Sequence, residues 1–363
     1  MTCCAFFFAA YLRADTLTNV QTVFLILMEN HDWSDIRGNT NCPYLNNTLL
    51  PIASRAEQYF TPPNLHPSAP NYIWLEAGTN FGILDDQPPA IQHTGSTNHL
   101  VTMLEKAGIS WKSYQESFNA GDSPLTNNYP YVVRHNPFVF FDDIATNLAR
   151  CTNHIRPYWE LAADLQSNTV ARYNFITPNA TNDMHDLAPG SWSAEKQGDD
   201  WLAREAPRIL SSAAYTNNGA LFILWDEGDN EVYDGPLGLL VLSPLARGRG
   251  YANSIHYTHS SLLRTLQEIF RVGPWLGDAA NADDLADLFQ CFCLTATSNP
   301  TNGLIELTLN QAVPGATNVI EVSSDLIGWL PLRTNRATGD SFHFVDASVT
   351  NAGRRFYRAL EFH

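Results

Sequence analysis

Lysine is scarce in this sequence, and positive charge as a whole is low. Three lysines occur in 363 residues, and 21 lysines and arginines stand against 37 aspartates and glutamates, which gives a formal net charge of −16. Proteins that bind nucleic acid normally present a basic face to the phosphate backbone. We therefore expect no nucleic-acid partner, and an anionic substrate would need a local cation, such as a bound metal, to offset this field.

Long apolar runs are also missing. No stretch after the first twelve residues approaches the roughly 18 uninterrupted apolar residues of a membrane helix, so we expect no transmembrane segment. The opening run, MTCCAFFFAAYL, is typical of the tail of a secretory signal within residues 1–15, although the basic start of such a signal is absent. A first buried strand is the alternative. The signal interpretation predicts a secreted, periplasmic or cell-surface protein.

No CxxC spacing occurs among the six cysteines, which argues against an ordinary zinc knuckle. A signal peptide would remove two of them and leave four whose pairing the sequence does not decide: Cys42, Cys151, Cys291 and Cys293. Disulfides formed in an oxidising compartment fit this pattern better than a zinc site. Free buried thiols are the alternative.

Among the features that are present, an apolar run from Val20 to Met28 stops abruptly at a polar segment that begins with Glu29. Such a run is typical of a central strand buried on both faces. The alternation then continues, with strands expected over 109–114, 173–177, 220–225 and 239–242, and helices over 98–107, 201–211 and 259–270, the helix at 201 being capped by residues 198–200. This order predicts an α/β fold, a three-layer αβα sandwich with a mainly parallel central sheet.

The pattern changes near residue 298. Helical periodicity disappears, and short alternating segments separated by turn residues appear at 304–309, 318–323, 329–333, 341–346 and 355–360. Segments of this kind predict a small antiparallel all-β sandwich. We therefore predict a main domain over 16–298 and an accessory domain over 299–363.

Polar residues capable of chemistry stand at two strand ends of the main domain. Glu29 and Asn30 follow the first apolar run, and Asp226 and Glu227 follow the strand at 220–225. Since the carboxyl ends of parallel strands meet at one edge of a sheet, these side chains are expected to converge. Carboxylate and amide oxygens suit a hard divalent cation, whereas each pair alone is also compatible with a plain strand end or solvated turn.

A serine between two prolines, in LHPSAPNY, adds a candidate nucleophile. Prolines restrict the backbone on both sides of Ser68, and a helix is expected to start here. Backbone N–H groups at a helix N-terminus favour a phosphate or an anionic transition state. A metal held by the four strand-end residues could lower the pKa of the hydroxyl and make it a nucleophile.

Six motifs in order resemble those of the bacterial phosphoesterase family, which includes acid phosphatases and phospholipases C and belongs to the alkaline-phosphatase superfamily. They are LMENHDWSDIRGN, HPSAPNY, YNFITPNATNDMHD, GDDWL, FILWDEGD and YTHSSLLRTLQEIF, and they span about residues 20–272. The serine turn is also similar to the turn that carries the nucleophile in nucleotide pyrophosphatase/phosphodiesterases. The resemblance implies hydrolysis of phosphate esters through a phosphoserine.

By this resemblance each candidate residue gains an expected role. Glu29, Asn30, Asp226 and Glu227 fall on the metal-ligand motifs. Asp226-Glu227 stands where two-zinc members have an Asp-His pair, so the resemblance implies one divalent ion, such as Ca, Mg or Mn, rather than two zincs. Ser68 falls on the nucleophile, with Asn71 holding a phosphoryl oxygen and His185 contacting the phosphate or protonating the leaving group. Asp183 is expected as a further substrate contact, and His66 either contacts substrate or braces the turn.

The sequence is compatible with three functions. The first is an acid-phosphatase-like phosphomonoesterase, the second a phospholipase C acting on phospholipid diesters, and the third a secreted binding protein that has lost catalysis on the same fold. The tail, with VIEVSSDLIGWLPLRTN and FHFVDASVTNAGRRFYRAL, resembles a small β-sandwich module of secreted Verrucomicrobia proteins. Docking to a surface or partner, or passive stabilisation, is what that resemblance implies.

Overall fold

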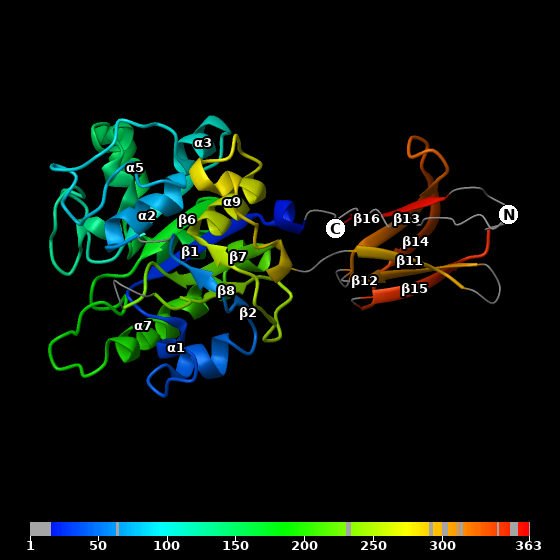
Figure 1. Cartoon of the computed structure of the whole chain (residues 1–363), viewed down its shortest axis with the longest axis horizontal. Helices are drawn as coiled ribbons and strands as arrows, with labels where there is room; N and C mark the ends of the chain where they lie inside the picture. Colours follow the sequence, from blue (N-terminus) through cyan, green and yellow to red (C-terminus); the bar gives the residue numbers. More distant parts are fainter. Residues whose placement is uncertain are drawn as a thin grey trace. The chain divides into compact units, whose positions relative to one another are not determined.

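The computed structural model describes residues 16–62, 65–229, 234–289, 293–299, 304–310, 312, 315–339, 341–348 and 355–362. The chain divides into two compact units, one formed by Leu17–Phe289 and the other containing residues 290–363 (Figure 1). The predicted boundary at 298/299 falls later than this division, because residues 293–298 form a strand that pairs within the second unit. Residues 1–15, on which the signal-peptide prediction rests, lie outside the described part.

The first unit is built on an eight-stranded sheet with the order β5-β4-β6-β1-β7-β8-β2-β9. Within this sheet only β8 runs antiparallel to its neighbours, which confirms the prediction of a mainly parallel α/β sheet. The strands are β1 (Thr22–Met28), β2 (Ser54–Ala56), β4 (Trp111–Gln115), β5 (Ile155–Pro157), β6 (Tyr173–Thr177), β7 (Gly219–Trp225), β8 (Leu239–Leu242) and β9 (Ala252–Asn253). A separate pair is formed by β3 (Tyr59–Phe60) and β10 (Tyr257–Thr258).

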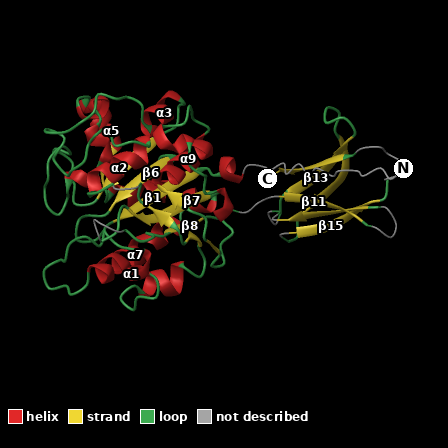
Figure 2. Cartoon of the chain, viewed as in Figure 1, coloured by secondary structure: helices red, strands yellow, loops and turns green. Residues whose placement is uncertain are grey.

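Helices cover both faces of this sheet (Figures 1 and 2). Helices α2, α3, α5 and α9 lie on one face, and α1 and α7 lie on the other, which gives the three predicted layers. The helices are α1 (Trp33–Ile36), α2 (Ser68–Ala77), α3 (Leu100–Lys106), α4 (Asp142–Ala145), α5 (Leu148–His154), α6 (Glu160–Ser167), α7 (Ala194–Leu210), α8 (Ala213–Thr216) and α9 (His259–Phe270).

The central strands are apolar because both of their faces are covered. All seven residues of β7 are buried, as are six of the seven residues of β1. The two strands pair in parallel from Thr22 opposite Gly219 to Met28 opposite Trp225. Their carboxyl ends are therefore in register, and the residues that follow each strand lie side by side at one edge of the sheet.

One helix start was predicted wrongly. Helix α7 begins at Ala194 rather than at residue 201, and its N-cap is Ser193, whose hydroxyl accepts the backbone N–H of Lys196. Asp199 lies inside the helix, where its carboxylate accepts the backbone N–H groups of Tyr44 and Leu45. The glycine and aspartates that suggested a cap are thus tolerated in the helix interior, because tertiary hydrogen bonds give Asp199 a role there.

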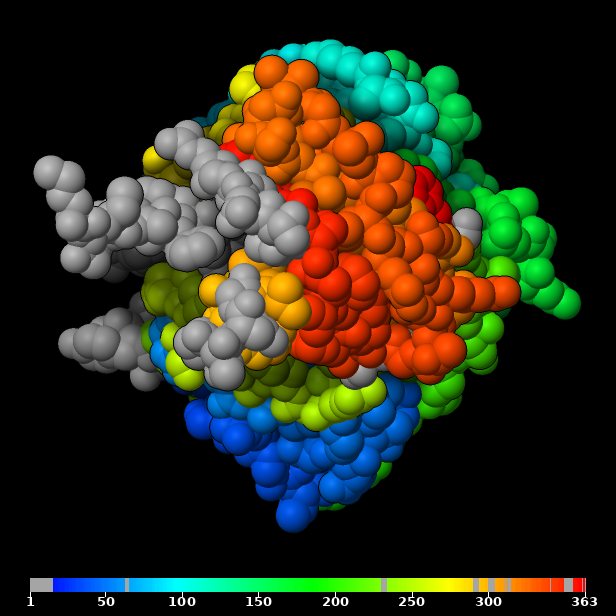
Figure 3. All heavy atoms as spheres, turned by 90° about the vertical axis from the view of Figure 1, so that its right-hand side faces the viewer, coloured from blue at the N-terminus to red at the C-terminus, as the bar shows by residue number. Residues whose placement is uncertain are grey.

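The second unit contains two three-stranded antiparallel sheets, β11-β12-β15 and β14-β13-β16. The strands are β11 (Cys293–Ser298), β12 (Ile305–Asn310), β13 (Thr317–Ser323), β14 (Leu330–Arg336), β15 (Ser341–Asp346) and β16 (Phe356–Phe362). A small core of Leu309, Ala312 and Ala337 lies within it. Figure 3 shows one face of this unit in orange and red. The predicted all-β accessory unit is present, with β11 as a strand that the sequence pattern did not indicate.

Two further expectations concern thiols and membranes. Cys42 and Cys151 are buried free thiols, so the disulfide prediction is wrong for these two residues and the alternative of free thiols holds. Cys291 lies outside the described residues, as does the side chain of Cys293. Among the helices that the structure describes, none has the length and apolarity needed to cross a bilayer.

Candidate active site

The ends of β1 and β7 place two pairs of polar residues together. Glu29 follows β1 and Asp226 follows β7, and the backbone N–H of Asn30 donates to Asp226 Oδ1 over 3.2 Å. Asn30 has a φ of +51°, in the left-handed region that asparagine tolerates better than most non-glycine residues. The chain therefore turns sharply after β1, and Glu29 is left fully buried at the sheet edge.

Ser68 lies beside these carboxylates. It is the first residue of α2, and its hydroxyl donates toward Glu29 Oε2 at 3.1 Å and Glu227 Oε1 at 3.4 Å. The start of the helix also brings the positive end of the helix dipole to the same place. A serine hydroxyl thus lies between two buried carboxylates at the positive end of a helix dipole.

Asn71 and His66 hold Glu227 in position. The Asn71 amide donates to Glu227 Oε2 at 3.0 Å and to the carbonyl of Leu65 at 2.8 Å. His66 lies with Nδ1 3.0 Å from Glu227 Oε2 and with Nε2 2.8 Å from Asp234 Oδ2. Hydrogen bonds to Asp234 and Glu227 raise the pKa of His66 to about 10, so its ring is an imidazolium between two carboxylates. Both ring nitrogens of His66 face the protein, which favours the bracing role over substrate contact.

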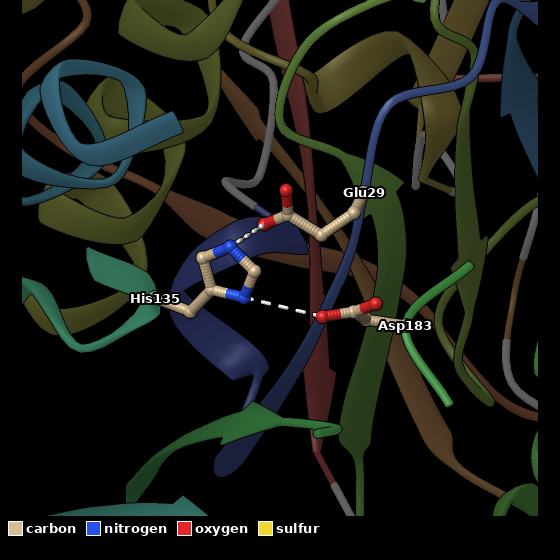
Figure 4. Close-up of side chains that lie close together, drawn as sticks. All are labelled: Glu29, His135 and Asp183. Atoms are coloured by element: carbon tan, nitrogen blue, oxygen red, sulfur yellow. Dashed lines mark ion pairs between the residues drawn. The ribbon is translucent and has the colours of Figure 1, made fainter. Parts of the chain in front are cut away.

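A histidine that the sequence did not reveal completes the other side of the cluster. His135, in a short 3-10 helix over Val133–His135 (η3), lies with Nε2 3.3 Å from Glu29 Oε1 and Nδ1 3.1 Å from Asp183 Oδ2 (Figure 4). The ring stacks against Tyr72, whose hydroxyl donates to the same Glu29 oxygen. Asp183 is fully buried here, so it belongs with Glu29 and His135 rather than at an exposed substrate surface.

His185 faces a different set of partners. Its Nδ1 lies 2.7 Å from Asp186 Oδ1, and its Nε2 lies 3.3 Å from Nη2 of Arg134. Since an arginine only donates, Nε2 is the acceptor and Nδ1 carries the proton. Met184, between Asp183 and His185, has a φ of +83°, which turns the chain so that these two neighbours serve separate parts of the site.

Four carboxylates, which we call the carboxylate cluster, dominate the electrostatics: Glu29, Asp183, Asp226 and Glu227. Burial raises the pKa of Glu29 well above its usual range, and the charges of Asp226 and Asp183 add to this. Burial likewise raises the pKa values of the other three, although His66 opposes the rise at Glu227. Burial lowers the pKa of His135 well below its usual value, so its ring is neutral. Gathering acids in this way is unfavourable unless a cation is bound.

The donor atoms of the cluster fit a metal ion. Asn30 Oδ1 and Asp226 Oδ2 are buried and accept no hydrogen bond from any described residue. Buried acceptors normally accept a hydrogen bond. Buried oxygens that accept none, among carboxylates whose pKa values are raised, therefore indicate a cation site. Ligand atoms of Glu29, His135 and Asp183 also lie within 4.8 Å of one another. The predicted oxygen set and this second set share Glu29.

His259, which opens α9, has a supporting role. Its Nε2 lies 2.6 Å from the carbonyl oxygen of Asp226, and its Nδ1 lies 3.0 Å from the hydroxyl of Tyr59. Burial lowers its pKa to about 4, so the neutral ring donates to the carbonyl and accepts from the tyrosine. His259 is therefore a packed residue, and this packing fixes the backbone at the end of β7.

Comparison with known proteins now defines the class. The model of the Phosphoesterase family matches residues 55–273, more than half of the chain. The chain belongs to the phosphoesterase family, which confirms the prediction of a hydrolase acting on phosphoric ester bonds. The matched range includes Ser68, His185, Asp226 and Glu227, whereas Glu29 and Asn30 precede it.

Particular relatives agree with this family. The chain is 29% identical over 278 residues to a phosphatidylinositol-3-phosphatase of Mycobacterium tuberculosis, covering 77% of this chain and 86% of the relative. It is 28% identical over 293 residues to a probable acid phosphatase of Kluyveromyces lactis, covering 73% of this chain and 64% of that protein. This chain thus spans somewhat less than two thirds of the length of the yeast relative. None of these matches tests the resemblance of the C-terminal unit, which stays a prediction.

Solved structures with related architecture have low sequence identity. A phosphonate monoester hydrolase from Silicibacter pomeroyi superposes with a TM-score of 0.48 at 12% identity, covering 81% of this chain and 80% of that chain. The murine ectonucleotide pyrophosphatase / phosphodiesterase 5 superposes with a TM-score of 0.48 at 11% identity, covering 74% and 100%.

Proposed function

We propose that this protein hydrolyses phosphate monoesters through a phosphoserine formed on Ser68, assisted by one divalent cation. The observation that carries the proposal is the position of the Ser68 hydroxyl, at a helix N-terminus and within hydrogen-bond distance of Glu29 and Glu227. Membership of the phosphoesterase family supports the reaction class. The cluster around the serine supports the cation, because four buried carboxylates need an opposite charge.

The reaction proceeds in two displacements. Ser68 Oγ attacks phosphorus in line with the ester oxygen, the new Oγ–P bond forms as the P–O ester bond breaks, and the hydroxyl proton passes to Glu29 or Glu227. The alcohol leaves with the proton that this carboxylate took from Ser68. Water then attacks the phosphoserine, the P–Oγ bond breaks, and inorganic phosphate leaves while the serine regains its proton. The positive end of the α2 helix dipole favours the charge on the phosphoryl oxygens.

The cation would be held by the predicted ligands, Glu29, Asn30, Asp226 and Glu227. When bound it supplies positive charge that lowers the pKa of the serine hydroxyl and stabilises the transferring phosphoryl group. Oxygen ligands favour a hard ion such as Ca, Mg or Mn. His135 and Asp183 form the competing donor set with Glu29, and metal content separates the two: Asp226→Asn lowers it if the predicted set binds, and His135→Asn lowers it if the second set binds.

The remaining residues act by positioning. Asn71, predicted to hold a phosphoryl oxygen, has both amide N–H groups directed at protein acceptors, so we assign it the positioning of Glu227 and the Leu65 turn. His66 serves the same end through its two carboxylate partners. His185 directs its Nδ1 proton at Asp186 and its Nε2 accepts from Arg134, so we assign it a positioning role rather than donation of a proton to the leaving oxygen. Asp183 orients His185 through its backbone N–H and contributes to the carboxylate cluster.

Two wider predictions accompany this function. We propose that the protein is exported, supported by the apolar residues 1–12 and the low lysine content, and that the C-terminal unit either docks to a surface or partner or stabilises the chain passively. The mature N-terminus of secreted protein, read by mass spectrometry, tests export: a start near residue 15 supports it, and an intact Met1 in the cell contradicts it.

The decisive assay is release of nitrophenol from a phosphate monoester and from a diester. Parent protein and Ser68→Ala are compared, each with and without a chelator, and Ser212→Ala is the control because Ser212 also lies at the start of a helix, as the N-cap of α8, away from the site. We expect monoester activity that disappears with Ser68→Ala and with the chelator. A diester preference would favour the phospholipase C alternative, and a Ser68→Ala variant as active as the parent would exclude the phosphoserine.

A further inference from the structure

Arg134 is an arginine that contacts residues around the proposed site. Of the lysines and arginines that the structure describes, it alone has an ion pair or hydrogen bond with residues around the site: Nε lies 3.5 Å from Asp86 Oδ2, and Nη2 lies 3.3 Å from His185 Nε2. It precedes His135, which lies against Glu29. Arg134 thus places a positive charge beside His185 and next to the histidine that contacts the carboxylate cluster.

The guanidinium of Arg134 has spare hydrogen-bonding capacity. Among described residues it makes one hydrogen bond, from Nη2 to His185, and one ion pair, from Nε to Asp86, whereas an arginine has five N–H donors. Arg150 provides a contrast, because its three nitrogens donate to Glu105, Asp143 and Thr102 at 2.6 to 2.9 Å. Arg150 is satisfied by its own fold, whereas Arg134 has donors left for a ligand.

Asp86 links Arg134 to the nucleophile. Its Oδ1 accepts the backbone N–H of Ala69, the residue after Ser68, over 2.9 Å, and its Oδ2 faces the guanidinium. One carboxylate therefore joins the first turn of α2 to the arginine. This arrangement fixes the arginine relative to the serine hydroxyl without using all of its donors.

We propose that Arg134, positioned by Asp86, binds non-bridging oxygens of the substrate phosphate and selects the dianionic phosphate of monoesters over diesters. The inference rests on the proposed function and adds the substrate class. A guanidinium recognises two phosphate oxygens at once and is always charged. A monoester offers three non-bridging oxygens and two charges, whereas a diester offers two oxygens and one charge. The arginine therefore contributes more to the binding of a monoester than to the binding of a diester.

Kinetics of Arg134→Met test this selection. We expect kcat/KM for nitrophenyl phosphate to fall by about 100-fold and that for bis(nitrophenyl) phosphate by less than about 5-fold, with a matching rise in the inhibition constant of inorganic phosphate. Arg134→Lys should recover part of the loss, and Asp86→Asn should raise KM more than it lowers kcat. Arg156→Met, which removes an arginine paired to Glu160 on the surface, is the control and should leave all three constants unchanged.

Equal losses on both esters with an unchanged phosphate inhibition constant would overturn the proposal, as would no loss at all. If the melting curve shows that Arg134→Met does not fold, Arg134→Lys is used in its place. The test is then the loss of kcat/KM on the monoester relative to the loss on the diester. Calorimetric binding of inorganic phosphate to Ser68→Ala, with and without Arg134→Met, separates this proposal from the function. Should the parent hydrolyse neither ester, weaker phosphate binding with Arg134→Met still supports the arginine site, and equal binding refutes it.

Discussion

The two units of the chain each bury aspartate, but they treat it differently. In the C-terminal unit, Asp346 accepts from Ser348 through Oδ1 and from Arg355 and Tyr357 through Oδ2. Although burial acts in the opposite direction, these hydrogen bonds lower its pKa. In the first unit, Asp226 keeps a buried oxygen without a partner, and burial and Glu227 raise its pKa.

This difference distinguishes a carboxylate whose partners all come from its own fold from a carboxylate that needs a ligand as its partner. Asp346 is neutralised by its own unit, so its environment is complete without any added group. Asp226 lies among three other acids at the end of a central strand, where the chain provides too few donors for them. Burying charge without compensation is costly, and such sites are maintained where a cation or substrate supplies the missing partner.

The largest expected effect comes from replacing Asp226 with asparagine, and the same replacement at Asp346 serves as the comparison. Asp226→Asn should lower kcat for the monoester by about 1000-fold, which corresponds to about 4 kcal/mol, because a ligand of the cation is weakened. Asp346→Asn should leave kcat unchanged. Steady-state kinetics of both variants decide the point, and equal activity in the two would show that the unpaired oxygen of Asp226 has no catalytic meaning.

Removal of divalent ions should destabilise the first unit. Chelation leaves the carboxylate cluster without its counter-charge, so we expect the melting temperature of the parent to fall by about 5 °C or more, with recovery on adding metal. The same treatment should shift Asp226→Asn much less. Differential scanning calorimetry measures both. An unchanged melting temperature in the chelated parent would argue against a resident ion.

Glu76 gives a test of buried acid away from the cluster. Burial raises its pKa to about 8, so the folded state holds a proton that the unfolded state loses near pH 4.5. Its contribution to stability is therefore full below pH 4.5 and is lost progressively as the pH rises to 8, by up to roughly 5 kcal/mol. Glu76→Gln keeps an acceptor for the Tyr173 hydroxyl and removes this loss.

Urea unfolding of Glu76→Gln and parent at pH 5 and pH 9 measures the effect. The variant should be the more stable protein at pH 9, and the two should approach each other at pH 5. Glu160→Gln on α6 is the control. A parent–variant difference that does not change with pH would mean that Glu76 is ionised in the folded protein.

The smallest effect is expected for Asp346, whose partners all come from its own unit. Asp346→Asn keeps the shape but weakens the bonds to Arg355 and Tyr357, so the C-terminal unit should lose about 1 to 2 kcal/mol of stability at pH 7. Because the pKa of Asp346 is lowered by folding, its contribution is present above pH 4 and disappears on acidification. Chemical denaturation at pH 7 and pH 3 checks this, and an equal deficit at both values would contradict the ion-pair account.

Much of the site's location followed from the strand pattern. Glu29 and Asp226 both terminate long apolar runs, and parallel pairing of β1 with β7 makes such residues neighbours. Ser68 was recognisable because its flanking prolines favour a helix start. These features are local, so a single sequence carries them.

Other parts of the site depend on contacts between distant residues. His135 and Arg134 lie in the irregular stretch between β4 and α4, where no periodicity marks them, and the motif Arg-His before an apolar run was the weak signal available. The start of α7 was misplaced because Asp199 gains its partners from Tyr44 and Leu45, far away in sequence. The contacts of Asn71 and His66 with Glu227 likewise form only when the strands assemble.

The central claim is that Ser68 carries the phosphoryl group during turnover. The most direct measurement is acid quenching of the parent during hydrolysis of a phosphate monoester, followed by peptide mass spectrometry. The account predicts one added phosphoryl group on the peptide that contains Ser68, absent from Ser68→Ala. An active parent with no phosphorylated Ser68 peptide at any quench time, together with an active Ser68→Ala variant, would contradict it.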